Sequence, residues 1–402
     1  MFKKSLLPAL ITASLTTSTM SYASLFDISV SANGQTYQAS FENAEESIDS
    51  FDTSNLDANL SNFNEITDAA LGVLNYRGLE MRFEYLKDSS VVRFSVPSIN
   101  IDETFNGATR EESTDQLGDY LKSEGGDMLN KINKALAAVS PTDPVAGNPD
   151  SLMATQVANI HSGTISDTNT STNKETFDTD NKFDLGVRFG SYQVNGSDVE
   201  SIHLPLAYTF NFDSAPGHKL SIQLPVSYSR TNDKAETYSL GAGIAYTYPV
   251  TDNLSFTPGI SYGAIGSVDL GSVAALESIS LTTRYDFELF NQQWRFGNTL
   301  ARVRTLELDF DDYTINPDLN NTIMVNGITW QSVPLNWLET EVFFTDTRYF
   351  GDELFSERSN EIGFAVATPE RATYLKFKVG ASYVFTDRSE VNGFKLNMGS
   401  SF

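Results

Sequence analysis

The sequence predicts an all-β transmembrane barrel of about 12 antiparallel strands, preceded by a small α+β domain and a helical connector. Three observations favour this fold class. Residues 183–402 alternate apolar and polar residues in segments of about ten, as strands with one lipid-facing side do. Short connections alternate with longer ones along the same region. The chain has 402 residues and lacks the ~20 continuous apolar residues that a transmembrane helix needs.

The alternation divides the C-terminal region into twelve expected strands. Two of them repeat each other, with SIHLPLAY at 201–208 and SIQLPVSY at 221–228. Because proline lacks a backbone donor, Pro205 and Pro225 each predict a bulge or a distorted pair. The expected strands are 183–193, 199–212, 219–230, 236–249, 253–264, 274–289, 292–304, 322–331, 336–346, 360–368, 373–386 and 392–402.

The connections between these strands predict the orientation of the barrel. An even number of strands places both barrel ends on the periplasmic side, where turns are short. The turns expected there are 213–218, 250–252, 290–291, 332–335 and 369–372. The longer outer loops are expected at 265–273, 305–321 and 347–359. In a soluble β-sandwich, by contrast, there is no reason for short turns to lie at one end and long loops at the other.

Residues 24–112 predict a small ββαββ domain. Alternating apolar residues flank Asn33-Gly34, which is a hairpin signal, and a second hairpin is expected around Lys87-Asp88-Ser89. Between the hairpins, apolar residues recur at helical spacing and predict a helix. These residues are Leu56, Leu60, Phe63, Ile66, Ala70, Val73 and Leu74.

Residues 113–182 predict a helical and flexible connector that includes a possible pore helix. Ser113 and Gln116 resemble a capping box, and the first helix is expected to run to Val139, with a weak point at Gly125-Gly126.

A second helix is expected over 151–160, capped by Asp150, and a polar tether follows over 162–182. An open lumen would leak, so either helix is a candidate to fill it, or inward side chains do so.

The first 23 residues predict a secretory signal peptide. Lys3 and Lys4 supply the positive start, residues 6–15 are mostly apolar, and Ser21-Tyr22-Ala23 offers small residues for cleavage after Ala23. The chain has no cysteine, which excludes lipoprotein processing and disulfides.

The charge excludes one class of partner. The formal net charge is −25, and losing Lys3 and Lys4 with the signal peptide leaves 25 basic against 52 acidic residues, or −27. Such a chain does not bind nucleic acid through its overall field.

The end of the chain suggests a family. Phe402 closes a strand in which the alternating positions are apolar, and this pattern resembles the assembly signal of outer-membrane proteins. The proposed signal is Phe394, Leu396, Met398 and Phe402. Together with the signal peptide, the helix and the twelve strands, it resembles the translocator domain of autotransporters over residues 113–402.

Only about 90 residues precede the connector, so the chain is most similar to solitary autotransporter-like barrels without a conventional passenger. The resemblance implies a location in the outer membrane and contact with its lipid. It also implies partners in the barrel assembly machinery and periplasmic chaperones. We expect no enzymatic activity and no cofactor; the barrel would display or translocate its N-terminal domain. Two alternatives remain, a twelve-stranded channel for small solutes and an outer-membrane lipid hydrolase.

Candidate catalytic and metal residues are few. His161 is expected in the tether, His218 in a periplasmic turn and His203 on the lumen side of its strand near Ser201, where two residues on one strand face make no triad. No zinc spacing or phosphate-cradling loop occurs. The acidic loop 305–321 lacks the glycine and spacing of a calcium loop, so a solvated acidic loop is favoured. Its acidic residues are Glu307, Asp309, Asp311, Asp312 and Asp318.

Charged residues also occupy the polar rows of the expected strands. Their mixed signs favour pairing inside a filled lumen over an ion-selective channel. They are Arg188, Arg284, Asp286, Glu288, Glu339, Glu341, Lys376, Lys378 and Lys395.

Overall fold

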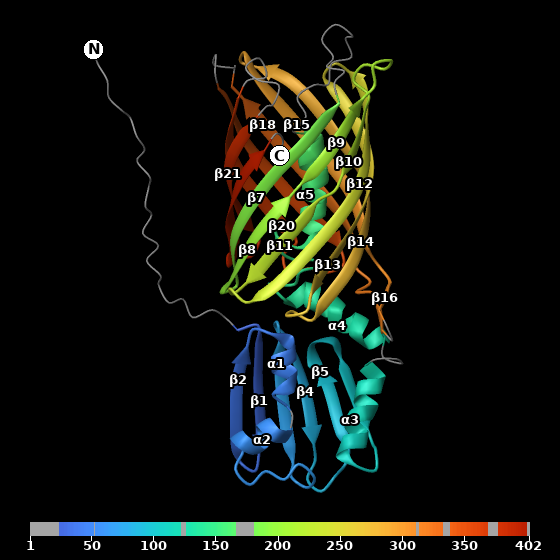
Figure 1. Cartoon of the computed structure of the whole chain (residues 1–402), viewed down its shortest axis with the longest axis vertical. Coiled ribbons are helices and arrows are strands. Elements are labelled where there is room, and N and C mark those ends of the chain that lie inside the picture. The colour runs from blue at the N-terminus through green and yellow to red at the C-terminus, as the bar shows by residue number, and fades with distance from the viewer. Residues whose placement is uncertain are drawn as a thin grey trace, which may run out of the picture.

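The computed structural model describes residues 24–51, 53–121, 126–165, 181–310, 313–332, 338–368 and 377–399. Figure 1 shows a tall barrel standing on a smaller domain of strands and helices. The expected signal peptide, residues 1–23, lies outside the described residues, as does Phe402.

The barrel is a closed antiparallel sheet of twelve strands, as predicted, since β22 pairs with β7. Fourteen segments make up these twelve strands, because two strands are each interrupted once. The segments are β7 (Lys182–Val194), β8 (Ser197–Leu204), β9 (Leu206–Asn211), β10 (Lys219–Gln223), β11 (Val226–Thr231), β12 (Ala235–Thr251), β13 (Leu254–Ser267), β14 (Ser272–Leu289), β15 (Gln292–Leu306), β18 (Asn320–Gln331), β19 (Glu339–Gly351), β20 (Arg358–Ala367), β21 (Lys378–Thr386) and β22 (Val391–Gly399).

The two interruptions lie at the repeated prolines. β8 and β9 are separated at Pro205, and β10 and β11 at Leu224-Pro225. Proline cannot donate, but each carbonyl still accepts, from Gly186 N at 3.2 Å and from Gly241 N at 2.8 Å. The predicted distortion is therefore confirmed, and the two prolines remove little more than two backbone N–H donors from the strand pairing.

The barrel is apolar outside and polar inside. On β14, Ile279 is 66% exposed while Ser280 and Thr282 on the other face are buried. This is the arrangement of a barrel whose outer face meets lipid. Among the described residues, no helix has the length and apolar content needed to cross a membrane.

The strands extend further than predicted at the end of the barrel nearer the small domain. We call this end, with the connections after β7, β11, β13, β15, β19 and β21, the domain end. The expected loop 265–273 shrinks to 268–271, and 347–359 shrinks to 352–357. Loop 305–321 remains long but contains a hairpin of β16 (Leu308–Phe310) and β17 (Tyr313–Ile315). The contrast in loop length is thus weaker than the sequence suggested.

The small domain is one antiparallel sheet with helices packed against it, in the order β2-β1-β3-β4-β5-β6. Its core contains Phe26, Phe94 and Val96, all at most 1% exposed. The elements are β1 (Phe26–Ala32), β2 (Gln35–Phe41), α1 (Ala44–Asp49), α2 (Thr53–Asn59), β3 (Ala70–Tyr76), β4 (Leu79–Tyr85), β5 (Val92–Val96), η1 (Pro97–Ile99), β6 (Ile101–Phe105) and α3 (Arg110–Asp119).

The predicted helix between the two hairpins is wrong beyond Asn59. The side chain of Asn64 accepts from the backbone N–H groups of Ile66 and Thr67, which makes a turn. β3 follows and pairs with both β1 and β4. The hydrogen bonds that β3 makes with a strand on each side outweigh the helical spacing of its apolar residues. β6 is a further strand that the sequence did not predict.

The connector helices also begin elsewhere than predicted. Thr109, rather than Ser113, caps α3 by accepting from Glu112 N. α4 (Gly126–Val139) is a separate helix. Ser151, rather than Asp150, contacts the first turn of α5 (Leu152–Ile165), where its Oγ accepts from Ala154 N at 3.4 Å.

Candidate functional site

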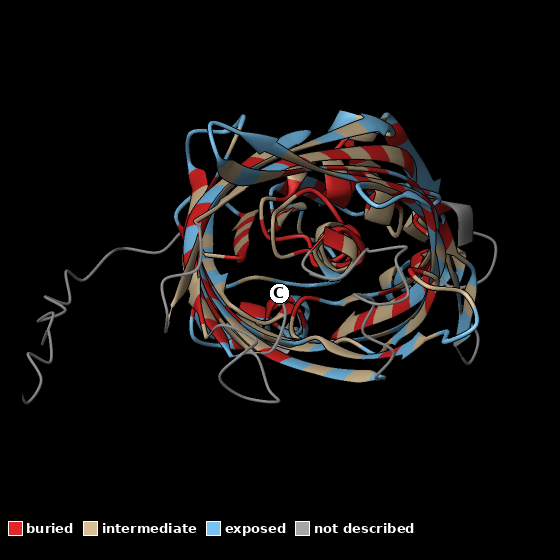
Figure 2. Cartoon of the chain, turned by 90° about the horizontal axis from the view of Figure 1, so that it is seen from above, coloured by how far each residue is buried: buried red, intermediate tan, exposed pale blue. Residues whose placement is uncertain are grey.

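The lumen of the barrel is occupied by α5. Figure 2, seen down the barrel, shows a helix inside the ring of strands. α5 runs from the domain end toward the opposite end, where β7 begins. Of the two helices that the sequence offered, the second therefore fills the lumen, and α4 lies at the domain end. There Asn130 Oδ1 accepts from Asn316 N at 2.7 Å.

Glycines in the barrel wall make room for this helix. A Cβ on Gly297 would lie 1.7 Å from Ile165 Cδ1, and one on Gly327 would lie 2.8 Å from His161 Nε2. A Cβ at either position would therefore force the facing side chain of α5 to move. β15 and β18 thus carry glycine opposite Ile165 and His161 of α5, where the wall leaves room for these side chains.

Polar contacts fix α5 in register with the strands. Gln156 Nε2 donates to Ser261 Oγ at 2.8 Å, and His161 Nδ1 lies 2.9 Å from Thr299 Oγ1. Arg188 donates to Asn159 Oδ1 and Ser162 Oγ, both at 2.8 Å. Buried polar pairs of this kind specify one position, because sliding the helix would leave each group unsatisfied.

The last turn of α5 ends on an arginine of the wall. Arg295 Nη1 donates to the carbonyl of Ile165 at 2.7 Å, which satisfies an unpaired acceptor at the helix C-terminus. Asp286 accepts from Arg295 Nε at 2.7 Å and lies 2.8 Å from Arg284 Nη2. This triad of two arginines and one carboxylate carries a net charge of +1, which complements the negative end of the helix dipole.

At the domain end, residues 140–149 close the lumen. We call this segment the strap. Its Gly147 O accepts from Ser356 N at 3.1 Å, and Ala137 O of the preceding helix α4 accepts from Phe355 N at 2.8 Å, so α4 and the strap are both hydrogen-bonded to the β19–β20 loop.

A buried ion pair ties the strap to the small domain. Arg77 Nη1 lies 3.4 Å from Asp143 Oδ2, with side-chain exposures of 0% and 3%. Burial raises the pKa of Asp143, and the charge of Arg77 opposes that shift.

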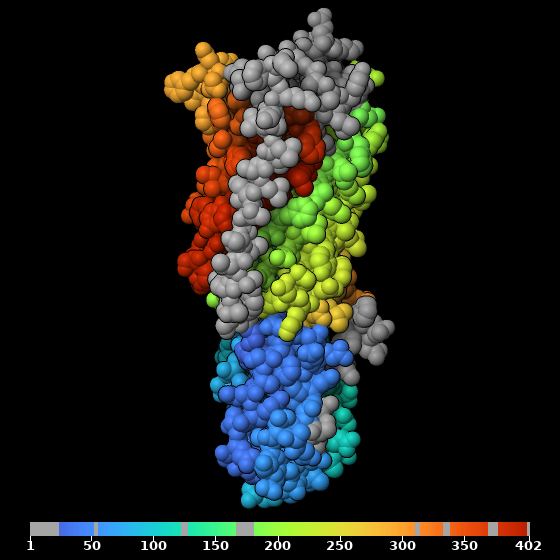
Figure 3. Space-filling view, turned by 60° about the vertical axis from the view of Figure 1, so that its left-hand side comes forward, coloured from blue at the N-terminus to red at the C-terminus, as the bar shows by residue number. Residues whose placement is uncertain are grey.

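The small domain packs directly on the barrel through the adjoining loops, as Figure 3 shows. Ala44 N donates to Asp269 O at 2.8 Å, and Tyr76 Oη donates to Leu270 O at 3.0 Å. Leu270 itself belongs to the apolar core of the domain. The domain is thus docked on the barrel rather than only tethered to it.

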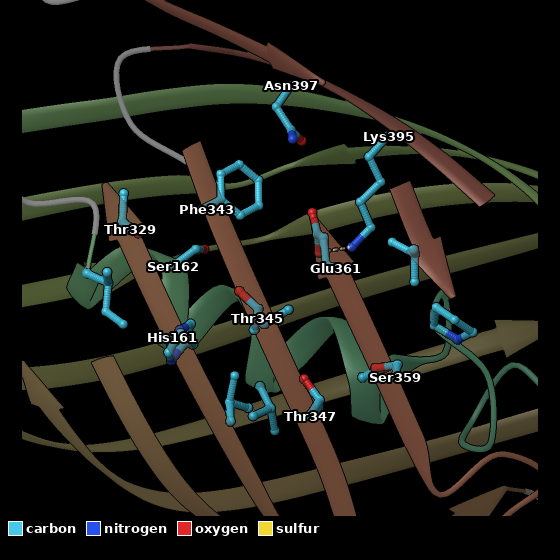
Figure 4. A pocket seen from close by; sticks show the side chains of 18 of the residues that line it. His161, Ser162, Thr329, Phe343, Thr345, Thr347, Ser359, Glu361, Lys395 and Asn397 are labelled. Atoms are coloured by element: carbon cyan, nitrogen blue, oxygen red, sulfur yellow. Dashed lines mark hydrogen bonds and ion pairs between the residues drawn. The ribbon is translucent and has the colours of Figure 1, made fainter. Parts of the chain in front are cut away.

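A cavity of about 150 Å³ remains beside α5. Figure 4 shows hydroxyl groups of Thr345, Thr347 and Ser359 along it, and the ion pair of Lys395 with Glu361 at 2.9 Å. At about 30 Å³ for each water, such a volume holds about five water molecules. It offers polar contacts for water or a small solute, and the strap covers the lumen beyond it at the domain end.

Several of the charges predicted for the lumen form ion pairs, whereas Arg188 donates to α5 and Glu288 is exposed. Lys378 Nζ lies 2.5 Å from Glu341 Oε2, in addition to the Arg284–Asp286 and Lys395–Glu361 pairs. Glu361 escaped the sequence reading, although it lies on the polar row of its strand. Lys376 lies outside the described residues.

Two histidines bear on the hydrolase alternative. His203 Nε2 lies 2.8 Å from Asp150 Oδ1 and 3.2 Å from Ser201 Oγ, so both partners share one ring nitrogen. A catalytic triad requires the acid and the nucleophile on opposite nitrogens. His161, expected in the tether, is instead 7% exposed within α5.

The acidic loop 305–321 is described except for residues 311 and 312. Its Asp318 is 84% exposed at the side chain and lies 3.8 Å from Lys134 Nζ. Within the described ranges no three acidic or histidine side chains gather as metal ligands. In β22, Phe394 and Leu396 point outward at 67% and 44% exposure. Their role as an assembly signal, with Met398, stays a prediction.

No family model matches the chain, and no curated protein matches it. Among solved structures, the barrel resembles the beta domain of the Bordetella autotransporter BrkA, at 16% identity and a TM-score of 0.42, over 55% of this chain and 98% of that chain. It also resembles the translocator domain of the autotransporter NalP from Neisseria meningitidis, at 9% identity and 0.42, over 55% and 88%.

A third similar structure is the KdgM porin, at 11% identity and a TM-score of 0.34, over 55% of this chain and 99% of that chain. The similar structures thus include both translocator domains and porins, and the barrel itself is established by the strand pairing of this chain.

Proposed function

We propose that the protein is an outer-membrane barrel of the translocator type, without enzymatic activity, that holds its own N-terminal domain on the cell surface. One observation carries the proposal: α5 passes through the lumen and connects a domain at one mouth to the first strand at the other. Its 14 residues span about 21 Å. A segment in this position links the two sides of a membrane.

The direction follows from the topology. An even number of strands places the start of β7 and the end of β22 at the same end of the barrel, which is periplasmic in bacterial barrels. The domain end is then the outer end. The apolar outer face of the strands supports contact with outer-membrane lipid. The barrel assembly machinery and periplasmic chaperones are the partners proposed for its insertion.

Because the chain has no cysteine, single introduced cysteines test the orientation cleanly. Thr104→Cys lies on the small domain, and Asn253→Cys lies in the turn between β12 and β13 at the opposite end; both positions are exposed. We expect a membrane-impermeant maleimide to label T104C in intact cells. N253C, the matched control, should be labelled only after the outer membrane is permeabilised. The reverse pattern would overturn the proposal.

A channel for small solutes is the second candidate, and the polar cavity beside α5 is the observation that favours it. Planar-bilayer recording separates the two. A plugged lumen predicts a silent barrel that conducts only when α5 is removed, whereas steady conductance of the intact protein would favour the channel.

A further inference from the structure

The sheet of the small domain has one unprotected edge. β2 forms that edge, pairs only with β1 among the described strands, and reads QTYQASF. It has seven residues, no charge and no proline. Natural proteins usually guard such an edge with a charge, a proline, a bulge or a covering element.

The opposite edge is guarded. β6 has five residues, and Asp102 and Glu103 are both exposed on it. Asp102 is paired with Arg93 at 2.6 Å. A helix packs beside each edge strand, α1 beside β2 and α3 beside β6, so the charges are what distinguish the two edges. In a chain of net charge −25, two copies approaching along β6 would set carboxylates against each other. Along β2 they would not.

The hairpin geometry identifies the free backbone groups of β2. Asn33 and Gly34 both have positive φ, at 51° and 75°, as a two-residue type I′ turn requires. Gln35 and Ala32 therefore close the hairpin as a hydrogen-bonded pair. Hydrogen-bonded pairs alternate from there, so the N–H and C=O groups of Thr36, Gln38 and Ser40 point away from β1.

We infer that this edge pairs with β2 of a second copy of the chain, antiparallel and centred on Gln38. Gln38 then faces its own equivalent, and Thr36 faces Ser40 of the other copy. The three outward residues of each strand form six hydrogen bonds across the two-fold axis. No like charges meet at any of these positions.

The arrangement has a consequence that rests on the proposed function. β2 runs roughly along the barrel axis in Figure 1, so antiparallel strands point the two barrels in opposite directions. Two copies joined in this way would sit in facing membranes. The strand pairing itself requires only the chain and does not depend on which side of a membrane the domain occupies.

Disulfide crosslinking of the full chain in detergent tests the pairing and its register. Hydrogen-bonded antiparallel residues have Cα atoms about 5.5 Å apart, within disulfide reach. We expect Gln38→Cys to crosslink with itself. Thr36→Cys and Ser40→Cys, carrying tags of different size, should crosslink with each other and not with themselves, since like positions are four residues out of register.

Two controls make the result decisive. Thr104→Cys on β6 should not crosslink, and Gln38→Glu added to the T36C and S40C pair should abolish the mixed dimer by setting two carboxylates opposite each other. Self-crosslinking of T36C without the mixed dimer would indicate a parallel arrangement and overturn the inference. Crosslinking of every variant no better than T104C would also overturn it. Neither result bears on the maleimide labelling that tests orientation.

Discussion

The two sheets of this protein share the same alternation of apolar and polar residues, but the small domain buries the apolar face and the barrel turns it outward. In β1 of the small domain, Phe26 and Ile28 are buried and the residues between them are more exposed. In β14 of the barrel, Ser280 and Thr282 are buried and Ile279 is exposed. Period two alone therefore predicts strands. Whether an exposed face meets water or lipid has to be inferred from the length and number of the strands and from their closure into a barrel.

Where the barrel meets the small domain, residues of the barrel are buried in an apolar core as they would be in a water-soluble protein. At the domain end the barrel contributes Leu270 and Ala235 to the apolar core of the domain, at 1% and 0% exposure. The end of the barrel thus behaves as part of a water-soluble protein, whereas its middle does not. Changes at this contact should act more strongly than changes on either exposed surface.

The largest effect is expected from Arg77→Met. It leaves Asp143 buried without its cationic partner, which typically costs about 3–5 kcal/mol. We expect the small domain to undock and the strap to become sensitive to protease. Native-state hydrogen exchange of β3 and β4 would measure the loss as faster opening.

The double variant Arg77→Met with Asp143→Asn is the control for this experiment. An asparagine Oδ1 can still accept from Val145 N and Ala146 N, at 2.9 and 3.1 Å in the native chain. Much of the stability should return, because no uncompensated charge remains. If the double variant were as unstable as R77M, the pair would not be the source of the effect.

The next largest effect is expected inside the barrel, from Gly297→Ala. The added Cβ would lie 1.7 Å from Ile165 Cδ1, and overpacking of this kind costs about 1–3 kcal/mol. We expect α5 to loosen, and planar-bilayer recording should then show intermittent conductance.

Two variants define the cause of that change. Gly266→Ala introduces a Cβ with nothing within 4 Å and should leave the barrel silent. Ile165→Ala combined with G297A should restore closure, because it removes the clashing atoms. Conductance that persisted in the double variant would assign the defect to the wall rather than to the helix.

A smaller effect is expected at the domain contact from Tyr76→Phe. The change removes the hydrogen bond to Leu270 O and keeps the ring against Phe26, with centroids 4.9 Å apart. One such bond contributes about 0.5–1.5 kcal/mol. Hydrogen exchange should show a modest increase in opening at β3, well below that of R77M, and an equal effect would mean that the ion pair is not dominant.

Much of this architecture could be predicted because it repeats. Twelve strands each supplied the same signal, so an uncertain boundary in one did not change the fold class. β3 supplied a single signal, and its apolar residues also match helical spacing. Only its pairing with β1 and β4 decides in favour of a strand, and those partners lie far away in the sequence.

The sequence alone could not predict which helix fills the lumen, for a similar reason. The sequence predicts two helices in the connector, and nothing within either one distinguishes a pore helix from a surface helix. The decisive residues are Gly297 and Gly327, which become complementary to Ile165 and His161 only after the barrel closes. Glu361 lies on the polar row of β20, as Lys395 does on that of β22, but these strands are not sheet neighbours, so the sequence does not show that the two residues pair.

The smallest effect is expected on the exposed face of the small domain, from Asp102→Asn. Arg93 and Asp102 are joined by two hydrogen bonds of 2.6 Å, yet both side chains are about half exposed. Solvent screens such a pair, and we expect D102N to lower domain stability only slightly near neutral pH, less than any of the changes above.

The effect of Asp102→Asn on stability should depend on pH. The hydrogen bond from Arg93 holds the pKa of Asp102 below its ordinary value. Any stabilisation is therefore present above the unfolded pKa and lost as the pH falls through the folded pKa. A stability difference between the wild-type chain and D102N should thus be greatest at neutral pH and vanish in acid. A difference that grew on acidification would show that Asp102 acts through something other than its charge.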